Sequence, residues 1–351
     1  MPGGGGAQPD SINQPKGFIQ KSSLITLPIV FYTPETRLGG GAAALFTFRF
    51  TSEHPTVRPS QLQLGFAYTQ EQQILSYLPF DIYFKEEQWY ISGELGYYRY
   101  VYRFFGLGND TPSESETFEA TYPRLQLNIQ YMFRPRLYLG LWYWMDNYRI
   151  TEREADGALS TDKITGQEGG VISGMGLVAN YDSRNHLFYP TGGQRLQFRT
   201  FFNRRAFGSR YNFDRYSLDW SAYLPLGKGV MATNVVGEFL SGEVPFQQLA
   251  LLGGPKRMRG FFEGRFRDKT MWILQAEYRR TIKGIFGLTV FGGMGNVAPS
   301  PARLFSQKVH LAYGVGLRVR LTKKDKINLR IDAGWNEEGN LSPYLTVAEA
   351  F

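Results

Sequence analysis

Cysteine is absent from the 351-residue chain, and histidine occurs only 3 times. Without thiols, the protein can form no disulfide framework, no thiolate metal site and no cysteine nucleophile. The histidines, His54, His186 and His310, lie far apart in sequence, and the motifs of zinc hydrolases, serine hydrolases and phosphate-binding loops are missing. We therefore expect a protein that is not an enzyme and that holds no metal and no cofactor.

Long apolar runs are also missing. No stretch of about 18 apolar residues occurs, which excludes a transmembrane helix. The first residues, MPGGGGAQPD, have neither the basic nor the apolar region of a signal peptide. Because the start of the chain is rich in Gly, Pro and Gln without periodicity, we expect residues 1–21 to be a flexible leader and residues 22–351 to be the folded domain.

Positive charge and aromatic residues are abundant, with a formal net charge of +8 and 16% Phe, Trp and Tyr. The charge alone is compatible with nucleic acid, anionic lipid or a polyanionic glycolipid as partner. A nucleic-acid module would mix basic residues with exposed aromatic residues on one face. Here the two kinds alternate and fall on opposite faces, so we expect no nucleic-acid partner.

Apolar and polar residues alternate along most of the chain, which is typical of β-strands with one apolar face. In one segment, Tyr216, Leu218 and Trp220 alternate with Ser217 and Asp219. Each face stays consistent for roughly ten residues, whereas strands of soluble sheets centre on about five or six. About sixteen segments are predicted, near residues 24–34, 39–50, 60–70, 72–84, 88–102, 119–133, 135–151, 170–182, 193–203, 210–224, 229–241, 270–281, 285–296, 308–322, 325–336 and 342–351.

The connections alternate in length, as in barrels of bacterial outer membranes. Two connections depart from this alternation: 70–72 is short where a long one is expected, and 181–193 is long where a short one is expected. The short turns are residues 133–136, 225–229, 281–284 and 322–326, and the long loops are residues 103–118, 152–169, 242–269 and 297–307.

Strands of this length match tilted membrane crossings, and backbone groups inside a bilayer need internal partners. We therefore predict an all-β protein, a transmembrane antiparallel β-barrel of about sixteen strands integral to the bacterial outer membrane. The alternative is a soluble sandwich or two small β-domains, against which the strand length argues.

Several stretches, taken in order, resemble the BamA/TamA superfamily of outer-membrane barrels (bacterial surface antigen type). The resemblance covers nearly all of residues 24–351 and implies a role in assembling or translocating outer-membrane proteins. It rests on FFGLGND (104–110), YDSRNHLFYPTGGQRLQF (181–198), MRGF (258–261), GRFRDKTMWILQAEYRR (264–280), FGGMGNV (291–297) and the terminal YLTVAEAF.

The resemblance implies that the loop bearing Arg259, Gly260 and Phe261 folds into the barrel lumen, where Arg259 pairs with a carboxylate on the wall. By alternation Glu277 faces inward, and we predict that it is this anchor. A guanidinium suits such a pairing because it binds a carboxylate through two parallel hydrogen bonds. The family usually has an inward Asp on the next strand, where this chain has Gly293. Without the resemblance, a solvated basic loop would be the simpler interpretation.

Two further motifs follow from the resemblance. Asp182, Arg184, Pro190 and Gly193 match a periplasmic turn of the family, which would explain the long connection there. The final Phe351 matches the C-terminal signal that assembly machinery recognises. Alternation through the last strand, 342–351, would place Glu349 on the same face as Val347 and Phe351, where a carboxylate is unexpected.

The resemblance also predicts a mechanism and partners. Weak pairing between the first strand, 24–34, and the last, 342–351, would form a lateral seam at which a client strand adds. Pro28 lies in the first strand and has no N–H to donate. The sequence predicts a barrel-only member lacking POTRA domains, with outer-membrane lipid, lipopolysaccharide, client outer-membrane proteins and assembly lipoproteins as partners. The alternative is a plugged pore or structural barrel without insertase activity.

Overall fold

The computed structural model describes residues 19–50, 52–53, 57–321 and 326–351. Most of the expected leader, residues 1–18, lies outside this range. The first strand begins at Ile19, within the segment expected to be leader.

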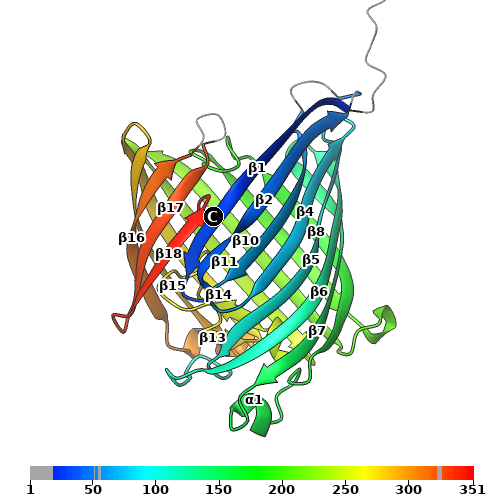
Figure 1. The fold of residues 1–351 in the computed structure, drawn as a ribbon, viewed down its shortest axis with the longest axis vertical. Coiled ribbons are helices and arrows are strands. Elements are labelled where there is room, and N and C mark those ends of the chain that lie inside the picture. The colour runs from blue at the N-terminus through cyan, green and yellow to red at the C-terminus, as the bar shows by residue number, and fades with distance from the viewer. Residues whose placement is uncertain (1–18, 51, 54–56, 322–325) are drawn as a thin grey trace, which may run out of the picture.

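Sixteen strands form one closed antiparallel barrel (Figure 1), and the soluble alternatives are excluded. The predicted strands are found close to their expected positions, because alternation over so many residues leaves little freedom in where each strand lies. The barrel strands are β1 (Ile19–Thr33), β2 (Arg37–Phe50), β3 (Ser60–Thr69), β4 (Ile74–Phe84), β5 (Trp89–Phe104), β6 (Glu116–Arg134), β7 (Leu137–Arg153), β8 (Gly170–Asp182), β9 (Gly193–Asn203), β10 (Phe213–Leu226), β11 (Gly229–Gly242), β14 (Thr270–Lys283), β15 (Phe286–Ala298), β16 (His310–Arg320), β17 (Asn328–Asn336) and β18 (Leu341–Val347).

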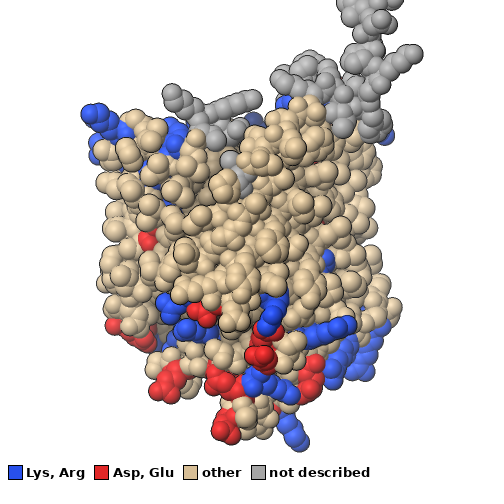
Figure 2. Space-filling model, in the orientation of Figure 1, with Lys and Arg blue, Asp and Glu red and all other residues tan. Residues whose placement is uncertain are grey.

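Alternation gives the barrel an apolar outer face and a largely polar inner face. In β16, Leu311, Tyr313 and Val315 are exposed on the outside, while the residues between them are buried. Figure 2 shows a band nearly free of charged side chains across this face of the molecule, with Lys, Arg, Asp and Glu gathered at its lower end and Lys and Arg also present at its upper end. Such a band suits the hydrocarbon region of a membrane. None of the helices within the described residues is long and apolar enough to span one.

The two ends of the barrel differ (Figure 1). We call the end that holds the start of β1 and the short turns the turn end, and the opposite end the loop end. In outer-membrane barrels short turns are periplasmic and long loops extracellular. The short 70–73 connection lies at the loop end and the long 183–192 connection at the turn end. The short helices are α1 (Ala158–Thr161), η1 (Arg205–Phe207), η2 (Phe246–Gln248) and η3 (Pro301–Ser306).

The longest connection, between β11 and β14, contains a small sheet that alternation did not reveal. It consists of β12 (Ala250–Leu252) and β13 (Phe266–Asp268), whose three-residue strands are too short to show a period. Residues 253–265 between these strands are called the lumen loop below. Phe246, Leu252, Phe261 and Phe266 of this connection are buried in the main hydrophobic cluster.

The last strand departs from its prediction, because β18 ends at Val347 and not at Phe351. Ala348 has a φ of +68°, a left-handed conformation that ends the strand. The tail after it leaves the line of the strand. The prediction that the strand continues to Phe351 is therefore wrong, since alternation cannot detect a residue that turns the backbone.

Candidate functional site: a lumen loop and an incomplete seam

The tip of the lumen loop contacts the inner wall of the barrel through Arg259. Its guanidinium donates to Glu277 on β14 and, at 2.5 Å, to Asp332 on β17. All three side chains are at most 1% exposed. The same guanidinium lies 3.7 Å from the ring centroid of Phe291. Two carboxylates and an aromatic face thus surround one cation, which is an arrangement suited to arginine and not to lysine.

Gly260 lets the loop backbone approach the wall closely. Its φ is +120°, and a Cβ there would come within 2.7 Å of the carbonyl of Trp335. The Gly260 N–H donates to the Tyr344 hydroxyl at 3.1 Å, and the Ser342 hydroxyl donates to the Gly260 carbonyl at 3.2 Å. Tyr344 and Ser342 belong to β18, so the loop tip is attached to the last strand of the barrel.

The apolar residues on either side of Arg259 and Gly260 pack against loop and inner-wall side chains. Phe261 is 2% exposed, with ring centroids 5.8 Å from Phe266 and 5.9 Å from His310. Gly293, at the position where the resemblance leads us to expect an inward Asp, leaves room for Met258, because a Cβ at Gly293 would lie 2.9 Å from the Met258 sulfur. The carboxylate that this strand lacks is supplied instead by Asp332.

A chain of ion pairs leads from the loop tip to the C-terminal tail. Glu277 also accepts from Arg279, and Asp332 also accepts from Arg318 at 2.5 Å. Arg318 then donates to Glu349 at 2.8 Å. Glu349 therefore faces the lumen, and its expected place on the same face as Val347 is wrong because the backbone turns at Ala348. The tail and the loop tip share one buried charge network.

Phe351 ends this tail inside the barrel. Its carbonyl accepts from Arg279 at 2.9 Å, and its ring lies 5.4 Å from the same guanidinium. It packs against inward-facing residues of β10 and β11, namely Tyr223, Val230 and Ala232. The side chain predicted to be an assembly signal is thus held in the lumen in this conformation.

The seam between β1 and β18 is short. β1 and β18 are joined at one residue pair, Tyr32 and Leu345. By contrast, β2 pairs with β1 along the whole strand from Ile19 to Thr33. Leu24, Ile25 and Pro28 are all exposed, so consecutive residues on both faces of β1 lack cover. The upper part of β1 runs past the end of β18 in Figure 1. Such an unpaired edge can template an added strand.

The turn motif forms a compact structure at the turn end. Arg184 donates to both carboxylate oxygens of Asp182, at 2.9 and 2.8 Å. Gly193 has a φ of +91°, and a Cβ there would lie 2.2 Å from the Ser183 carbonyl, so no other residue fits without strain. Pro190 is buried in the same turn. This motif is separate from the loop anchor.

A second attachment joins the lumen loop to the β1–β2 turn. The Glu263 N–H donates to Glu35 at 2.8 Å, and Glu35 is only 6% exposed. The Glu263 side chain is exposed to the lumen cavity, yet desolvation by the surrounding barrel and the neighbouring Glu35 carboxylate raise its pKa to about 7. Within the part of the chain that the structure describes, no cluster of His, Asp and Glu side chains could hold a metal ion.

The structure thus brings together Arg259, Gly260, Phe261 and Glu277, which the sequence singled out. Sequence reasoning missed Asp332 as the second carboxylate, although alternation places it on the inner face of its strand. It also missed Glu35 and Tyr344, since neither residue type nor spacing marks a turn or a strand as the neighbour of a loop more than eighty residues away.

A closed barrel with an apolar outer face, a polar lumen and a loop bound across that lumen defines a transmembrane barrel of the outer-membrane type. The Omp85 superfamily domain matches residues 46–338, and the chain belongs to this superfamily. Its barrels are bacterial outer-membrane proteins of the assembly and translocation type. No curated protein shows a significant match to the chain.

Solved structures show the same fold. BamA from Haemophilus ducreyi lacking POTRA domains 1–3 is 17% identical, with a TM-score of 0.62 over 93% of this chain and 70% of that one. CdiB from Escherichia coli is 10% identical, with a TM-score of 0.61 over 95% and 63%, and CdiB from Acinetobacter baumannii is 10% identical, with 0.58 over 93% and 60%. The chain thus spans 60% to 70% of the length of these relatives. At such identities the likeness shows the fold alone.

Proposed function

We propose that this barrel inserts outer-membrane proteins, or assists a protein that does, through the seam between β1 and β18. The observation that carries the proposal is the single registered pair, Tyr32 and Leu345, in a barrel whose other strand pairs are extensive. A client strand could pair with the free edge of β1 by β-augmentation. Client outer-membrane proteins are therefore the expected partners, along with assembly lipoproteins and lipopolysaccharide.

The attached lumen loop supports this proposal. Its tip bonds to Tyr344 and Ser342 on β18, and its base bonds to Glu35 between β1 and β2. Both sides of the seam are therefore tied to one loop. A change in the docking of this loop would alter how far the two edge strands can separate.

The test is a barrel locked at its seam. Because the chain has no cysteine, the pair Tyr32→Cys and Leu345→Cys adds the only thiols, and oxidation would join the two strands. Cells that depend on the locked barrel should show a fall across many unrelated outer-membrane barrels by quantitative proteomics. The control pair, Val315→Cys and Ala333→Cys, joins β16 and β17, which are already fully paired. Normal barrel levels with the locked seam would exclude the mechanism.

The second candidate is a plugged pore, which the firm attachment of the lumen loop favours. A barrel of this size encloses space that must be filled or must conduct. Deleting residues 253–268 should open a large channel in planar bilayers if the loop serves as a plug. Unchanged outer-membrane composition after depletion of the protein, combined with such a channel, would favour the pore over the insertase.

A further inference from the structure

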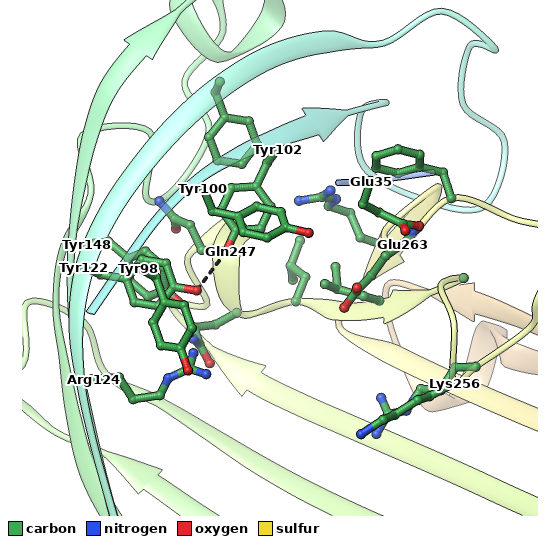
Figure 3. A pocket seen from close by; sticks show the side chains of 18 of the residues that line it. Glu35, Tyr98, Tyr100, Tyr102, Tyr122, Arg124, Tyr148, Gln247, Lys256 and Glu263 are labelled. Carbon is green, nitrogen blue, oxygen red and sulfur yellow. Dashed lines mark hydrogen bonds between the residues drawn. The ribbon is translucent and has the colours of Figure 1, made fainter. Parts of the chain in front are cut away.

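A cavity of about 590 Å³ lies in the lumen between the inner wall of β5, β6 and β7 and the lumen loop (Figure 3). Its volume falls within the range of about 300–1,000 Å³ that is typical of small-molecule sites. The loop anchor at Arg259 does not line it, so the cavity is distinct from the attachment already described.

One wall of the cavity is aromatic. The rings of Tyr98 and Tyr122 stack with centroids 5.2 Å apart, and those of Tyr122 and Tyr148 lie 4.5 Å apart. Trp144 continues this wall beside them. The inner wall of a membrane barrel is ordinarily polar, so an aromatic patch there needs a reason. Packing explains part of it, since the tyrosines and Phe118 belong to the main hydrophobic cluster and Phe118 contacts Phe246 of the connection to the lumen loop. The same rings also line the cavity.

Unpaired polar atoms belong to residues that line the same cavity. Glu35 Oε2 has no hydrogen-bond donor, and Trp144 Nε1 and Arg267 Nε have no acceptor within the described part of the chain. These three residues are 6%, 8% and 4% exposed, respectively. A buried polar group without a partner costs about 1–3 kcal/mol, so three of them around one cavity suggest that something else completes their bonding. A ligand that completes this bonding must carry both hydrogen-bond donors and acceptors.

The charges around the cavity nearly balance. Five basic and three acidic side chains line it. Arg124 is bonded through two nitrogens to Asp146, and Arg215 and Arg257 both face Glu238, at 3.5 and 2.8 Å. Figure 3 shows Glu35 and Glu263 on the side opposite the tyrosines. Neither a strongly anionic nor a strongly cationic ligand is selected by such a site, which instead suits an uncharged ligand rich in polar groups.

We propose that this cavity binds a saccharide of one or two rings. A sugar ring has an apolar C–H face that packs on an aromatic wall, and hydroxyl groups that both donate and accept. The tyrosine wall would pack against the C–H face of the sugar. Glu35, Trp144 and Arg267 would form hydrogen bonds with its hydroxyl groups. Two sources offer this chemistry: a free sugar and the glycan of a membrane glycolipid.

The test uses the full chain, purified in detergent and checked for a folded barrel by its heat-dependent shift on a gel. Saturation-transfer NMR with maltose and with the N-acetylglucosamine disaccharide should show transfer from aromatic protons to sugar protons. A second arm adds purified lipopolysaccharide in place of the free sugars. Transfer to a free disaccharide assigns a free sugar as ligand, and transfer to lipopolysaccharide alone assigns a glycolipid.

Two conservative variants are designed to keep the fold, and each removes one predicted hydrogen bond to the sugar. Trp144→Phe and Glu35→Gln should each weaken binding about fivefold or more, as expected from the loss of one hydrogen bond. The matched controls are Trp220→Phe, on the exposed outer face of β10, and Glu338→Gln, in an exposed loop. No transfer to any of the three probes in the folded wild-type barrel would overturn the proposal. So would binding that both cavity variants leave unchanged.

Discussion

Gly260 of the lumen loop and Gly334 of β17 meet backbone to backbone. A Cβ on Gly334 would lie 2.8 Å from the Gly260 nitrogen, and a Cβ on Gly260 would lie 2.7 Å from the neighbouring Trp335 carbonyl. No side chain fits between them. The position of the loop tip therefore depends on the close backbone approach that these two glycines allow, as well as on the ion pairs of Arg259.

Gly334→Ala should release the loop tip, because the added methyl group collides with loop backbone that cannot yield locally. Overpacking of this kind costs about 1–3 kcal/mol, which corresponds to roughly a 5- to 150-fold larger released population. Single-channel recording should show more frequent large openings than in the wild type. Gly339→Ala is the control, since nothing lies within 4 Å of its Cβ position, although its φ of +81° adds local strain. Equal opening frequencies in the two variants would contradict the close approach as the cause.

Arg259→Met should destabilise the barrel by about 3–5 kcal/mol, because Glu277 and Asp332 would remain buried with one cation fewer. Arg259→Lys should recover little of this loss, since a single ammonium cannot span both carboxylates as the guanidinium does. The measurement is urea unfolding of the detergent-solubilised barrel followed by tryptophan fluorescence. The control is Arg303→Ala, which alters an exposed arginine of η3. Full stability of the lysine variant would show that the paired geometry is unimportant.

The docking of the lumen loop should depend on pH through Glu263. Its pKa is raised to about 7 in the docked loop, from an ordinary value of 4.5, so the docked state binds the proton more tightly than the released state. Docking is then most favoured below about pH 4.5 and weakens as the pH rises through about 7. Channel openings should become more frequent between about pH 5 and pH 8. Glu263→Gln should weaken this dependence, leaving only the contribution of Glu35, whose pKa burial also raises, and Glu338→Gln should keep it in full. An unchanged pH profile in Glu263→Gln would disprove the assignment.

Glu349→Ala should let the C-terminal tail leave the lumen, because it removes the bonds to Arg318 and Asn328 that hold it there. A straightened tail would extend β18 along the free edge of β1. In the register of Tyr32 and Leu345, Val347 would then lie opposite Val30. Disulfide formation between Val30→Cys and Val347→Cys should therefore be several times faster in the Glu349→Ala background. Equal rates with and without Glu349 would mean that the tail does not limit the seam.

Phe351→Ala separates two roles of the terminal residue. If assembly machinery recognises Phe351, the variant should reach the outer membrane in a lower amount yet refold normally from urea into detergent. If the residue serves only to pack against Tyr223, Val230 and Ala232, refolding itself should suffer, by about 1–3 kcal/mol for a partly buried ring. Western blotting of membrane fractions and a refolding titration distinguish the two.

The barrel could be predicted almost entirely from the sequence, because alternation is a local property that each strand shows by itself. Residues 193–203 and 170–182 were assigned to strands with the bounds that the structure has. The same alternation placed Glu277 on the inner wall. The chain without Cys and with few His also excluded whole classes of chemistry, since composition limits which groups are available.

Only the tertiary structure decided which inward-facing groups meet. Asp332 faces inward by period two, but its pairing with Arg259, 73 positions earlier in the sequence, depends on how the barrel closes. The tail shows the limit most clearly: one left-handed residue, Ala348, turns Glu349 and Phe351 into the lumen and leaves the edge of β1 unpaired. Alternation predicts residues within a continuing strand. The left-handed backbone at Ala348, which ends the last strand, is stabilised instead by the tertiary contacts of Glu349 and Phe351 in the lumen.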